Sequence, residues 1–271
     1  MPRPEEPRLR IRDAIALGLL HGPAELLPVS SSGHVVLVPW LLGWPYSQLD
    51  AELRKCFEVA LHAGTVAALL VGLRGEVSEA VRTLDARELR LFALSSLPPA
   101  IAGLCLERTI ERRLGSPGCV AAGLAAGAVA MALADARGGT ARGRADAGDG
   151  DGLALGIAQA CALLPGISRN GATLTAARAR GFARADSSVL SRHVALPVIA
   201  GATGLKGVRL LRNGLPTGAR RGFAAGIAAS FAATLAATGL VARVDRGRSL
   251  AGFAAYRLAL AAVVLERLRR P

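Results

Sequence analysis

Long uncharged segments, each ended by charged residues, follow one another along most of the chain. These segments cover 26–49, 59–73, 91–106, 114–134, 152–168, 193–205, 222–242 and 249–265, the last interrupted by Arg257. An α-helix needs about 20 apolar residues to cross the roughly 30 Å of hydrocarbon in a bilayer, and somewhat fewer where charged ends reach the surface. The pattern therefore predicts an all-α, polytopic integral membrane protein with about ten hydrophobic helical segments.

The composition agrees with a membrane protein and excludes several other classes. Of the 271 residues, 52% are hydrophobic and 20% are charged, which excludes a disordered or fibrous chain. The formal net charge of +13 would also suit a nucleic-acid binder. However, the arginines lie in short clusters between the apolar segments and do not alternate with aromatic residues, as is typical of loops beside an anionic membrane surface. We therefore expect a protein embedded in a membrane, with no nucleic-acid partner.

The two halves of the chain share a pattern. One polar, glycine-rich segment, 136–152, divides the chain almost in half. On each side of it Ala-Leu-Gly is followed by Leu-Leu-Pro and then by a second glycine, and the two glycines are 15 residues apart in both halves. We favour an internal repeat over a chance match, with a first repeat at 1–135, a linker at 136–152 and a second repeat at 153–271, all in one membrane domain.

In each half an apolar segment stops at a proline and enters a turn rich in serine and glycine, at Pro28 and at Pro165. Backbone groups that lack partners cannot face lipid, so such breaks are tolerated only inside protein or along a wet cavity. Two broken helices in corresponding halves predict inverted repeats with a binding site between them.

The first of these turns carries the sequence HGPAELLPVSSSGH, from His21 to His34. Glu25 is the only charged residue in 14–49, and acids inside a membrane are costly and usually functional. The alternative is a carboxylate at a helix end that only caps the turn at 30–32. Three consecutive serines and a histidine beside the carboxylate favour a site.

The second turn carries LPGISRNGAT, at 164–173. Arg169 is the only charged residue in 152–177. A guanidinium has planar donors that suit phosphate oxygens, and a Gly/Ser turn offers backbone N–H groups to an anion. Arg169 could instead be a structural partner of Glu25, and both roles are compatible, with an ion pair in the empty site and phosphate in the filled one. Together the turns predict an anion site with acid–base capacity, which suits phosphoryl transfer assisted by Mg²⁺ or Ca²⁺.

The segments ELLPVSSSGH and PGISRNGAT closely resemble the two signature segments of the undecaprenyl-diphosphate phosphatases, also known as bacitracin-resistance proteins. Further similar features occur in the family's order: Phe57-Glu58-Val59-Ala60, Gln159, Ala195-Leu196-Pro197 and Tyr256-Arg257. The resemblance implies an enzyme of the bacterial inner membrane, built of interlocking inverted repeats with re-entrant helices. Its reaction would be hydrolysis of undecaprenyl diphosphate to undecaprenyl phosphate and inorganic phosphate on the outer face, which recycles the carrier lipid for cell-wall synthesis and gives bacitracin resistance.

The resemblance also implies roles for individual residues. Glu25 would bind metal or act as a base, Ser31 and His34 would be the candidate nucleophile and its acid–base partner in either order, and Arg169 would clamp the diphosphate. The expected phosphate-binding residues are Ser30, Ser32, Gly33, Ser168, Arg169, Asn170, Gly171 and Thr173. Glu25 and His21 are the expected ligands of the divalent cation.

Two departures from the family pattern bear on these roles. His21 stands where the family usually has a second acid, and imidazole prefers softer metals than Mg²⁺. Asn170 stands where the family commonly has serine, a mild change because asparagine keeps a hydrogen bond and tolerates turns.

The strongest rival function is a polyprenyl-phosphate transporter or flippase without hydrolytic activity, because many carriers are also built from inverted repeats with broken helices. A structural subunit with no site would leave two intramembrane charges unexplained. Beyond the lipid substrate, the candidate partner is a second copy of the chain in a homodimer.

Overall fold

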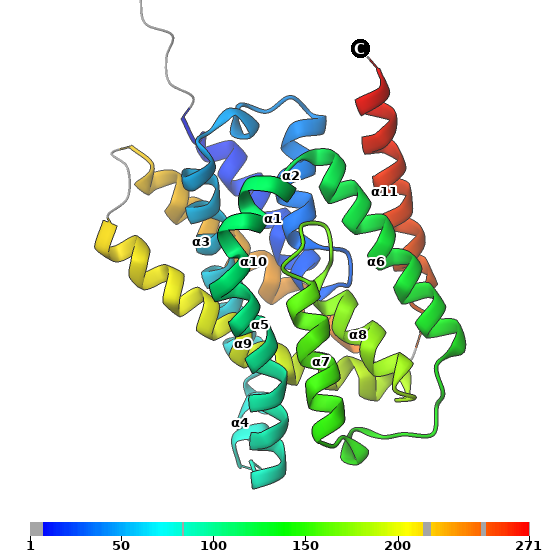
Figure 1. Cartoon of the computed structure of the whole chain (residues 1–271). Coiled ribbons are helices and arrows are strands. Elements are labelled where there is room, and N and C mark those ends of the chain that lie inside the picture. The colour runs from blue at the N-terminus through cyan, green and yellow to red at the C-terminus, as the bar shows by residue number, and fades with distance from the viewer. Residues whose placement is uncertain (1–7, 83, 214–217, 245–247, 271) are drawn as a thin grey trace, which may run out of the picture.

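The computed structural model describes residues 8–82, 84–213, 218–244 and 248–270 (Figure 1). These residues form eleven α-helices, two short 3-10 helices and one isolated backbone bridge, so the prediction of an all-α protein is confirmed. The helices are α1 (Ile11–Leu26), α2 (Ser31–Leu41), η1 (Pro45–Gln48), α3 (Ala51–Gly72), α4 (Arg74–Arg82), α5 (Ala86–Leu114), α6 (Pro117–Arg137), η2 (Arg144–Asp146), α7 (Asp149–Cys161), α8 (Arg169–Ala179), α9 (Arg184–Asn213), α10 (Arg220–Val244) and α11 (Ala251–Arg269).

Several helices are suited to a lipid environment. Four described segments are long and apolar enough to cross a membrane: Ala51–Gly72 in α3, Ala86–Leu106 in α5, Pro117–Arg137 in α6 and Arg220–Gly239 in α10. On α5, Leu97, Ile101 and Leu104 are each more than half exposed, at 56%, 54% and 75%, and their spacing places them on one face of the helix. An exposed apolar face of this kind is stable against lipid and unfavourable in water, so the fold is that of a multi-pass membrane protein.

Besides the nine-residue α4, four helices are too short to cross the hydrocarbon layer alone. The helices α1, α2, α7 and α8 have 16, 11, 13 and 11 residues. At a rise of 1.5 Å per residue, the shorter two measure about 17 Å, roughly half the thickness of the layer. The two halves of the chain therefore each contain a pair of short helices joined by a turn, at the positions where the sequence predicts breaks.

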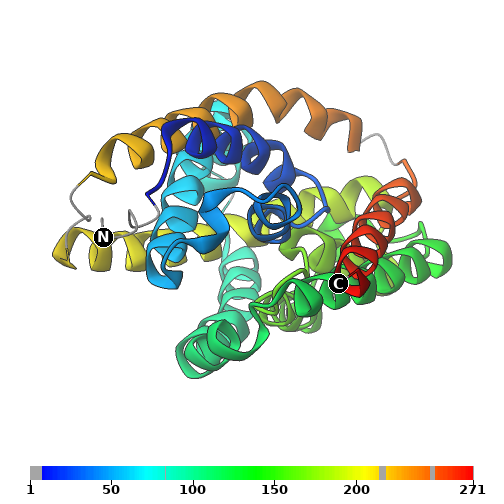
Figure 2. The ribbon, with the colours of Figure 1, turned by 90° about the horizontal axis from the view of Figure 1, so that it is seen from above.

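The short helices pack closely on longer ones through glycine. In Figure 2, α10 lies along α1, and a Cβ atom added at Gly18 of α1 would lie 2.5 Å from the carbonyl oxygen of Gly226 on α10. In the same way α7 packs on α5, where a Cβ at Gly156 would lie 2.6 Å from the carbonyl oxygen of Leu94. Glycine at these two positions thus lets the backbones approach more closely than any residue with a Cβ atom would allow.

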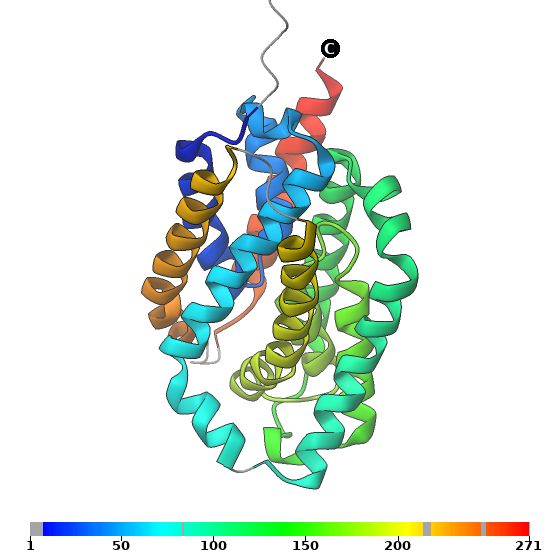
Figure 3. The same ribbon diagram turned by 90° about the vertical axis from the view of Figure 1, so that its left-hand side faces the viewer.

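The long helix α9 lies between α3 and the helices α5 and α8. It packs against α3 on one side and against α5 and α8 on the other, and Figure 3 shows it (yellow) in the middle of the molecule.

The residues between α6 and α7 are fastened to the start of α7 and the end of α8, because Arg142 donates to the carboxylate of Asp151 at 2.7 Å and to the carbonyl oxygen of Arg180 at 2.9 Å. Burial raises the pKa of Asp151, but hydrogen bonds from Arg142, Gly148 and Arg180 outweigh this effect and lower the pKa to about 2.

The close approach of α1 and α10 gives a test of the fold. We expect Gly18→Ala to push the two helices apart and to lower the free energy of unfolding in detergent by about 1–3 kcal/mol, seen as a lower Tm. The matched control is Gly103→Ala on α5, where no atom of the described residues lies within 4 Å of the added Cβ. The control should leave stability unchanged or raise it by up to about 1 kcal/mol, because alanine favours helix. Equal Tm values for the two variants would contradict this packing.

Candidate functional site

The turn between α1 and α2 is held by serine side chains. Ser30 is the N-cap of α2, and its hydroxyl oxygen accepts a hydrogen bond from the backbone N–H of Gly33 at 3.2 Å. Ser30 is also the only described residue other than glycine with a positive φ, at 73°. Backbone conformations of this kind are unfavourable for side chains with a Cβ, and they cluster at functional sites.

The turn between α7 and α8 has the same construction. Ser168 is the N-cap of α8, and its hydroxyl oxygen accepts from the N–H of Gly171 at 3.1 Å. The turn lies against α6, because a Cβ at Gly166 would lie 2.1 Å from the carbonyl oxygen of Val120. In both halves a serine caps a short helix and bonds to the glycine three residues later, which is the structural counterpart of the equal spacing in the sequence.

The two turns meet at a buried ion pair. Nη2 of Arg169, at the start of α8, donates to Oε1 of Glu25 at 2.7 Å, and the side chains are 19% and 7% exposed. Beside it, Nδ2 of Asn170 donates to the carbonyl oxygen of Leu26 at 2.7 Å. Ser31, the first residue of α2, donates its hydroxyl proton to Oε2 of Glu25. The ion pair that the sequence allows between Glu25 and Arg169 is therefore present.

His34 occupies a separate position on α2. Its Nδ1 donates to the carbonyl oxygen of Ser30 at 2.7 Å, which leaves Nε2 to accept from the hydroxyl of Tyr256 on α11 at 2.6 Å. The rings of His34 and Tyr256 are stacked, with centroids 5.6 Å apart. Both ring nitrogens thus have partners that hold the neutral imidazole in one tautomer.

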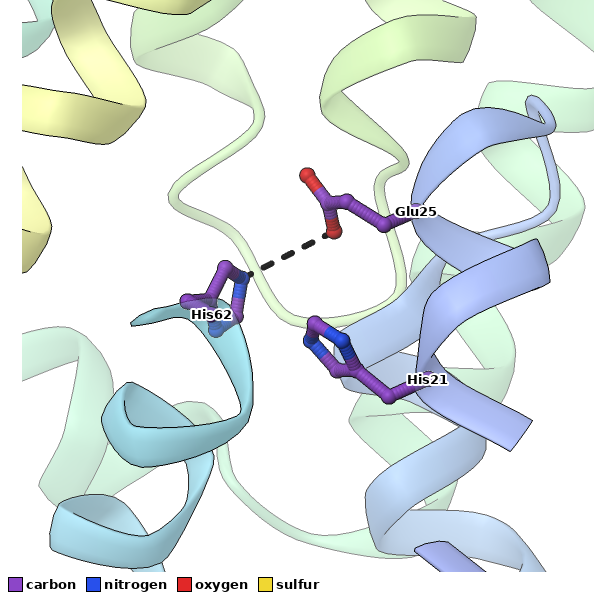
Figure 4. Close-up of side chains that lie close together, drawn as sticks. All are labelled: His21, Glu25 and His62. Atoms are coloured by element: carbon purple, nitrogen blue, oxygen red, sulfur yellow. Dashed lines mark ion pairs between the residues drawn. The ribbon is translucent and has the colours of Figure 1, made fainter. Parts of the chain in front are cut away.

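A third group of side chains gathers on the other oxygen of Glu25. Figure 4 shows His21 and Glu25 of α1 and His62 of α3 pointing toward one another, and each offers a ligand atom within 4.8 Å of the other two. Nε2 of His62 lies 3.7 Å from Oε2 of Glu25, and Nδ1 of His62 donates to the carbonyl oxygen of Glu58 at 2.8 Å. Because Nδ1 is used by the carbonyl oxygen of Glu58, Nε2 is the atom of the His62 ring that faces the carboxylate.

The other histidine of this group, His21, is held by a hydroxyl group of α3. It is fully buried, its Nδ1 lies 3.1 Å from the hydroxyl of Thr65, and its Nε2 is buried with no hydrogen-bond partner among the described residues. Thr65 belongs to a buried chain of hydroxyl groups that continues to Ser230 at 3.0 Å and Thr234 at 3.3 Å on α10. A buried nitrogen without a partner, beside a carboxylate and a second imidazole, fits a divalent metal ion.

The remaining residues expected to bind phosphate have other contacts. The hydroxyl of Thr173 is fully buried and faces α9, 2.5 Å from the hydroxyl of Ser191. Ser191 also donates to Oδ1 of Asn170 at 2.8 Å, so both ends of the Asn170 amide are used to join elements. Ser32 is partly exposed, with its hydroxyl 3.5 Å from that of Ser30.

Sequence reasoning missed His62, although a signal was available: this histidine is the only titratable side chain in the uncharged segment 59–73. It also missed the support from Ser230 and Thr234, because single hydroxyl groups in an alanine-rich helix carry no signal. The sequence gives Tyr256 no role beyond the family resemblance, and the structure places its hydroxyl on His34.

A cavity of about 240 Å³ adjoins the ion pair, and both Glu25 and Arg169 line it. The rest of its wall is mostly apolar and is formed by residues of α3, α4, α5 and α9, including Leu69, Val77, Val81 and Phe92, and by Leu73 and Leu84, which lie between helices. A polar end with a guanidinium and a carboxylate, continued by an apolar wall, suits a ligand with an anionic head and a hydrocarbon chain.

The fold and the site define an all-α membrane protein in which two broken helices bring a carboxylate and a guanidinium together beside an apolar cavity. Residues 14–263 match the family described as bacitracin resistance protein BacA. A relative from Geobacter sulfurreducens named undecaprenyl-diphosphatase is 40% identical over 271 residues, which cover 95% of this chain and 98% of the relative. Relatives of the same name from Pelobacter propionicus and Pelotomaculum thermopropionicum are 37% and 33% identical, and each match covers at least 95% of both chains. The chain belongs to the bacitracin resistance protein BacA family.

Proposed function

We propose that this chain is an undecaprenyl-diphosphatase, which hydrolyses undecaprenyl diphosphate to undecaprenyl phosphate and inorganic phosphate. The observation that carries the proposal is the ion pair between Glu25 and Arg169, which joins the two turns at the polar end of an apolar cavity. The full-length relatives named undecaprenyl-diphosphatase support the same substrate. Removal of the terminal phosphate would recycle the carrier lipid for cell-wall synthesis and account for bacitracin resistance.

The architecture that we propose is a pair of inverted repeats, 1–135 and 153–271, on either side of the polar linker 136–152. The packing supports an interlocking arrangement, because α1 and α3 of the first repeat pack on α10 of the second, while α7 and α9 of the second pack on α5 of the first. In this arrangement the helix pairs α1–α2 and α7–α8 are the re-entrant segments. The protein would lie in the bacterial plasma membrane, with its site open to the outer face and a homodimer as the candidate assembly.

Arg169 and Ser31 have the clearest roles in the proposed reaction. As the diphosphate enters, its terminal phosphate competes with Glu25 for the guanidinium of Arg169, which carries two-pronged donors suited to phosphate. Glu25 is then free to accept the proton of Ser31, whose hydroxyl already donates to it. The resulting alkoxide attacks the terminal phosphorus, the bond to the bridging oxygen breaks, and undecaprenyl phosphate leaves. Water then hydrolyses the phosphoserine and releases inorganic phosphate.

The backbone and His34 have supporting roles in this scheme. The N–H groups at the starts of α2 and α8 favour negative charge, so the turns at 30–33 and 168–171 stabilise the transferring phosphate. These turns are held or lined by the other residues expected to bind phosphate: Ser30, Ser32, Gly33, Ser168, Asn170, Gly171 and Thr173. His34 keeps both nitrogens bonded to Ser30 and Tyr256, which makes Ser31 the better candidate nucleophile and leaves His34 to hold the turn and the hydroxyl of Tyr256 in place.

We propose that a divalent cation is held by Glu25, His21 and His62, where it would neutralise charge on the phosphate. The sequence suggests Mg²⁺ or Ca²⁺, which prefer oxygen ligands. Two imidazole nitrogens beside one carboxylate instead favour a borderline metal such as Mn²⁺ or Zn²⁺. Thr65 would orient His21 from behind, as outer ligands commonly do in metal sites.

The metal site can be tested without measuring turnover. In detergent-solubilised, metal-free protein, calorimetric titration should show one Mn²⁺ or Zn²⁺ ion bound more tightly than Mg²⁺ or Ca²⁺. His62→Ala removes one ligand and should weaken this binding by at least about 10-fold, because the carboxylate and one imidazole remain. The control is His193→Ala, a histidine outside the group of three. Unchanged affinity in His62→Ala would contradict the assignment.

Catalysis is tested by phosphate release from undecaprenyl diphosphate. Glu25→Gln, Ser31→Ala and Arg169→Gln should each lower kcat by about 1,000-fold, because each removes a group that acts in the transition state. The controls are Glu266→Gln and Arg270→Gln, an exposed ion pair near the end of α11. A flippase without hydrolytic activity would release no phosphate in any variant. Normal turnover in Ser31→Ala would contradict the role of that serine as nucleophile.

A further inference from the structure

The cavity contains a second arginine that the proposed reaction has not used. Arg192 of α9 lines the cavity together with Arg169 and Glu25, and its side chain is 14% exposed. Its Nη2 lies 3.3 Å from Oε2 of Glu76 on α4, and its Nη1 donates to the hydroxyl of Ser188 at 3.1 Å. Glu76 also lines the cavity and is 42% exposed.

Hydrogen bonds fix the position of Arg192 relative to the turn of Arg169. Ser191, the neighbour of Arg192, donates to the side chain of Asn170, the neighbour of Arg169, at 2.8 Å. Asn170 is bonded in turn to the carbonyl oxygen of Leu26 at the end of α1. The start of α8, the end of α1 and this part of α9 therefore form one unit, with the two arginines directed into one cavity.

Arg169 alone neutralises only part of the charge of a bound diphosphate. A diphosphate monoester carries between two and three negative charges near neutral pH, because the last ionisation of a phosphate monoester has a pKa of about 6. Glu25 and Arg169 together have no net charge. A further positive group in the same cavity would therefore stabilise the bound headgroup, and a guanidinium of low exposure does so more strongly than one in water.

The residues that line the cavity, together with the proposed reaction, indicate which phosphate this second cation would meet. The terminal phosphate must lie at Ser31 and Arg169, where the proposed bond changes occur. The hydrocarbon chain must follow the apolar wall, where Leu73, just before α4, and Val77 of α4 are close neighbours of Glu76 along the chain. The phosphate attached to the lipid lies between these two ends of the substrate.

We propose that Arg192 binds the lipid-side phosphate of the substrate, and that Glu76 holds the guanidinium when the site is empty. This inference rests on the proposed function, because it names the contact of the phosphate that stays on the lipid. Glu76 and the phosphate then compete for one guanidinium, so entry of the headgroup releases the ion pair between α4 and α9. Since the product keeps the same phosphate, Arg192 binds substrate and product alike.

Uniform binding of substrate and product gives a distinctive kinetic signature. In Arg192→Gln, KM for undecaprenyl diphosphate and the inhibition constant of undecaprenyl phosphate should rise by the same factor, about 10-fold or more, while kcat changes little. Inhibition by inorganic phosphate, which occupies the terminal position, should stay at the wild-type level. The control is Arg90→Gln, which removes an arginine from an exposed ion pair with Asp149.

Glu76→Gln separates a binding role from a merely structural one. If Glu76 competes with the phosphate, its removal should lower KM and tighten product inhibition, the opposite of the effect of Arg192→Gln. If the pair only fastens α4 to α9, both variants should weaken binding together. Shifts in the same direction, or a change in inhibition by inorganic phosphate in Arg192→Gln, would overturn the proposal.

A binding measurement tests Arg192 even if the chain does not hydrolyse the diphosphate. Farnesyl phosphate and farnesol, titrated into detergent-solubilised protein, differ only in the phosphate. Arg192→Gln should weaken the binding of farnesyl phosphate by about 10-fold or more and leave the binding of farnesol unchanged. If the wild-type protein released no phosphate, the proposed hydrolase activity would be refuted, but the selective loss of farnesyl phosphate binding in Arg192→Gln would still support the role of Arg192. Equal weakening of both ligands, or of neither, would refute the role of Arg192.

Discussion

The structure depends on a single constraint: two opposite charges and two open helix ends must be satisfied inside a largely apolar protein. Glu25 and Arg169 are each costly to bury alone, and each stabilises the other at 2.7 Å. Without the other turn, each would keep a buried charge without its partner, and the carbonyl oxygen of Leu26 would lose the amide of Asn170. Asn170 supports the joint by bonding to Leu26 and Ser191, so that one residue connects three helices. The small residues of α1 and α7 then allow the long helices to enclose the joint.

The same pair is well suited to a site that must open. Buried ion pairs contribute little net stability, because desolvation consumes most of the attraction between the charges. In the proposed reaction, a phosphate would therefore replace the carboxylate of Glu25 at Arg169 with little net cost. The freed carboxylate would then be available to Ser31 and His62, which both lie at its second oxygen, and to the proposed metal ion. One exchange of partners would thus both bind the substrate and activate the nucleophile.

Much of this arrangement could be predicted from the sequence, and the parts that could not share a cause. The broken segments and their lone charges are local patterns, and the need to neutralise buried charges predicts that they meet. The contact of His34 with Tyr256 joins residues 222 positions apart, and no local pattern encodes which aromatic residue reaches the ring. His62 approaches Glu25 only because α3 packs beside α1. The pair of Glu76 with Arg192 likewise depends on how α4 and α9 are placed.

The coupling free energy between Glu25 and Arg169 tests the central claim most directly. It is obtained from the unfolding free energies, in one detergent, of the wild-type protein, Glu25→Gln, Arg169→Gln and the double variant. If the two side chains form a buried pair, each single variant leaves an uncompensated charge, and the double variant should be more stable than the sum of the single effects by about 1–3 kcal/mol. Effects that add to within about 0.5 kcal/mol would show that the two turns do not depend on each other, and would contradict the account.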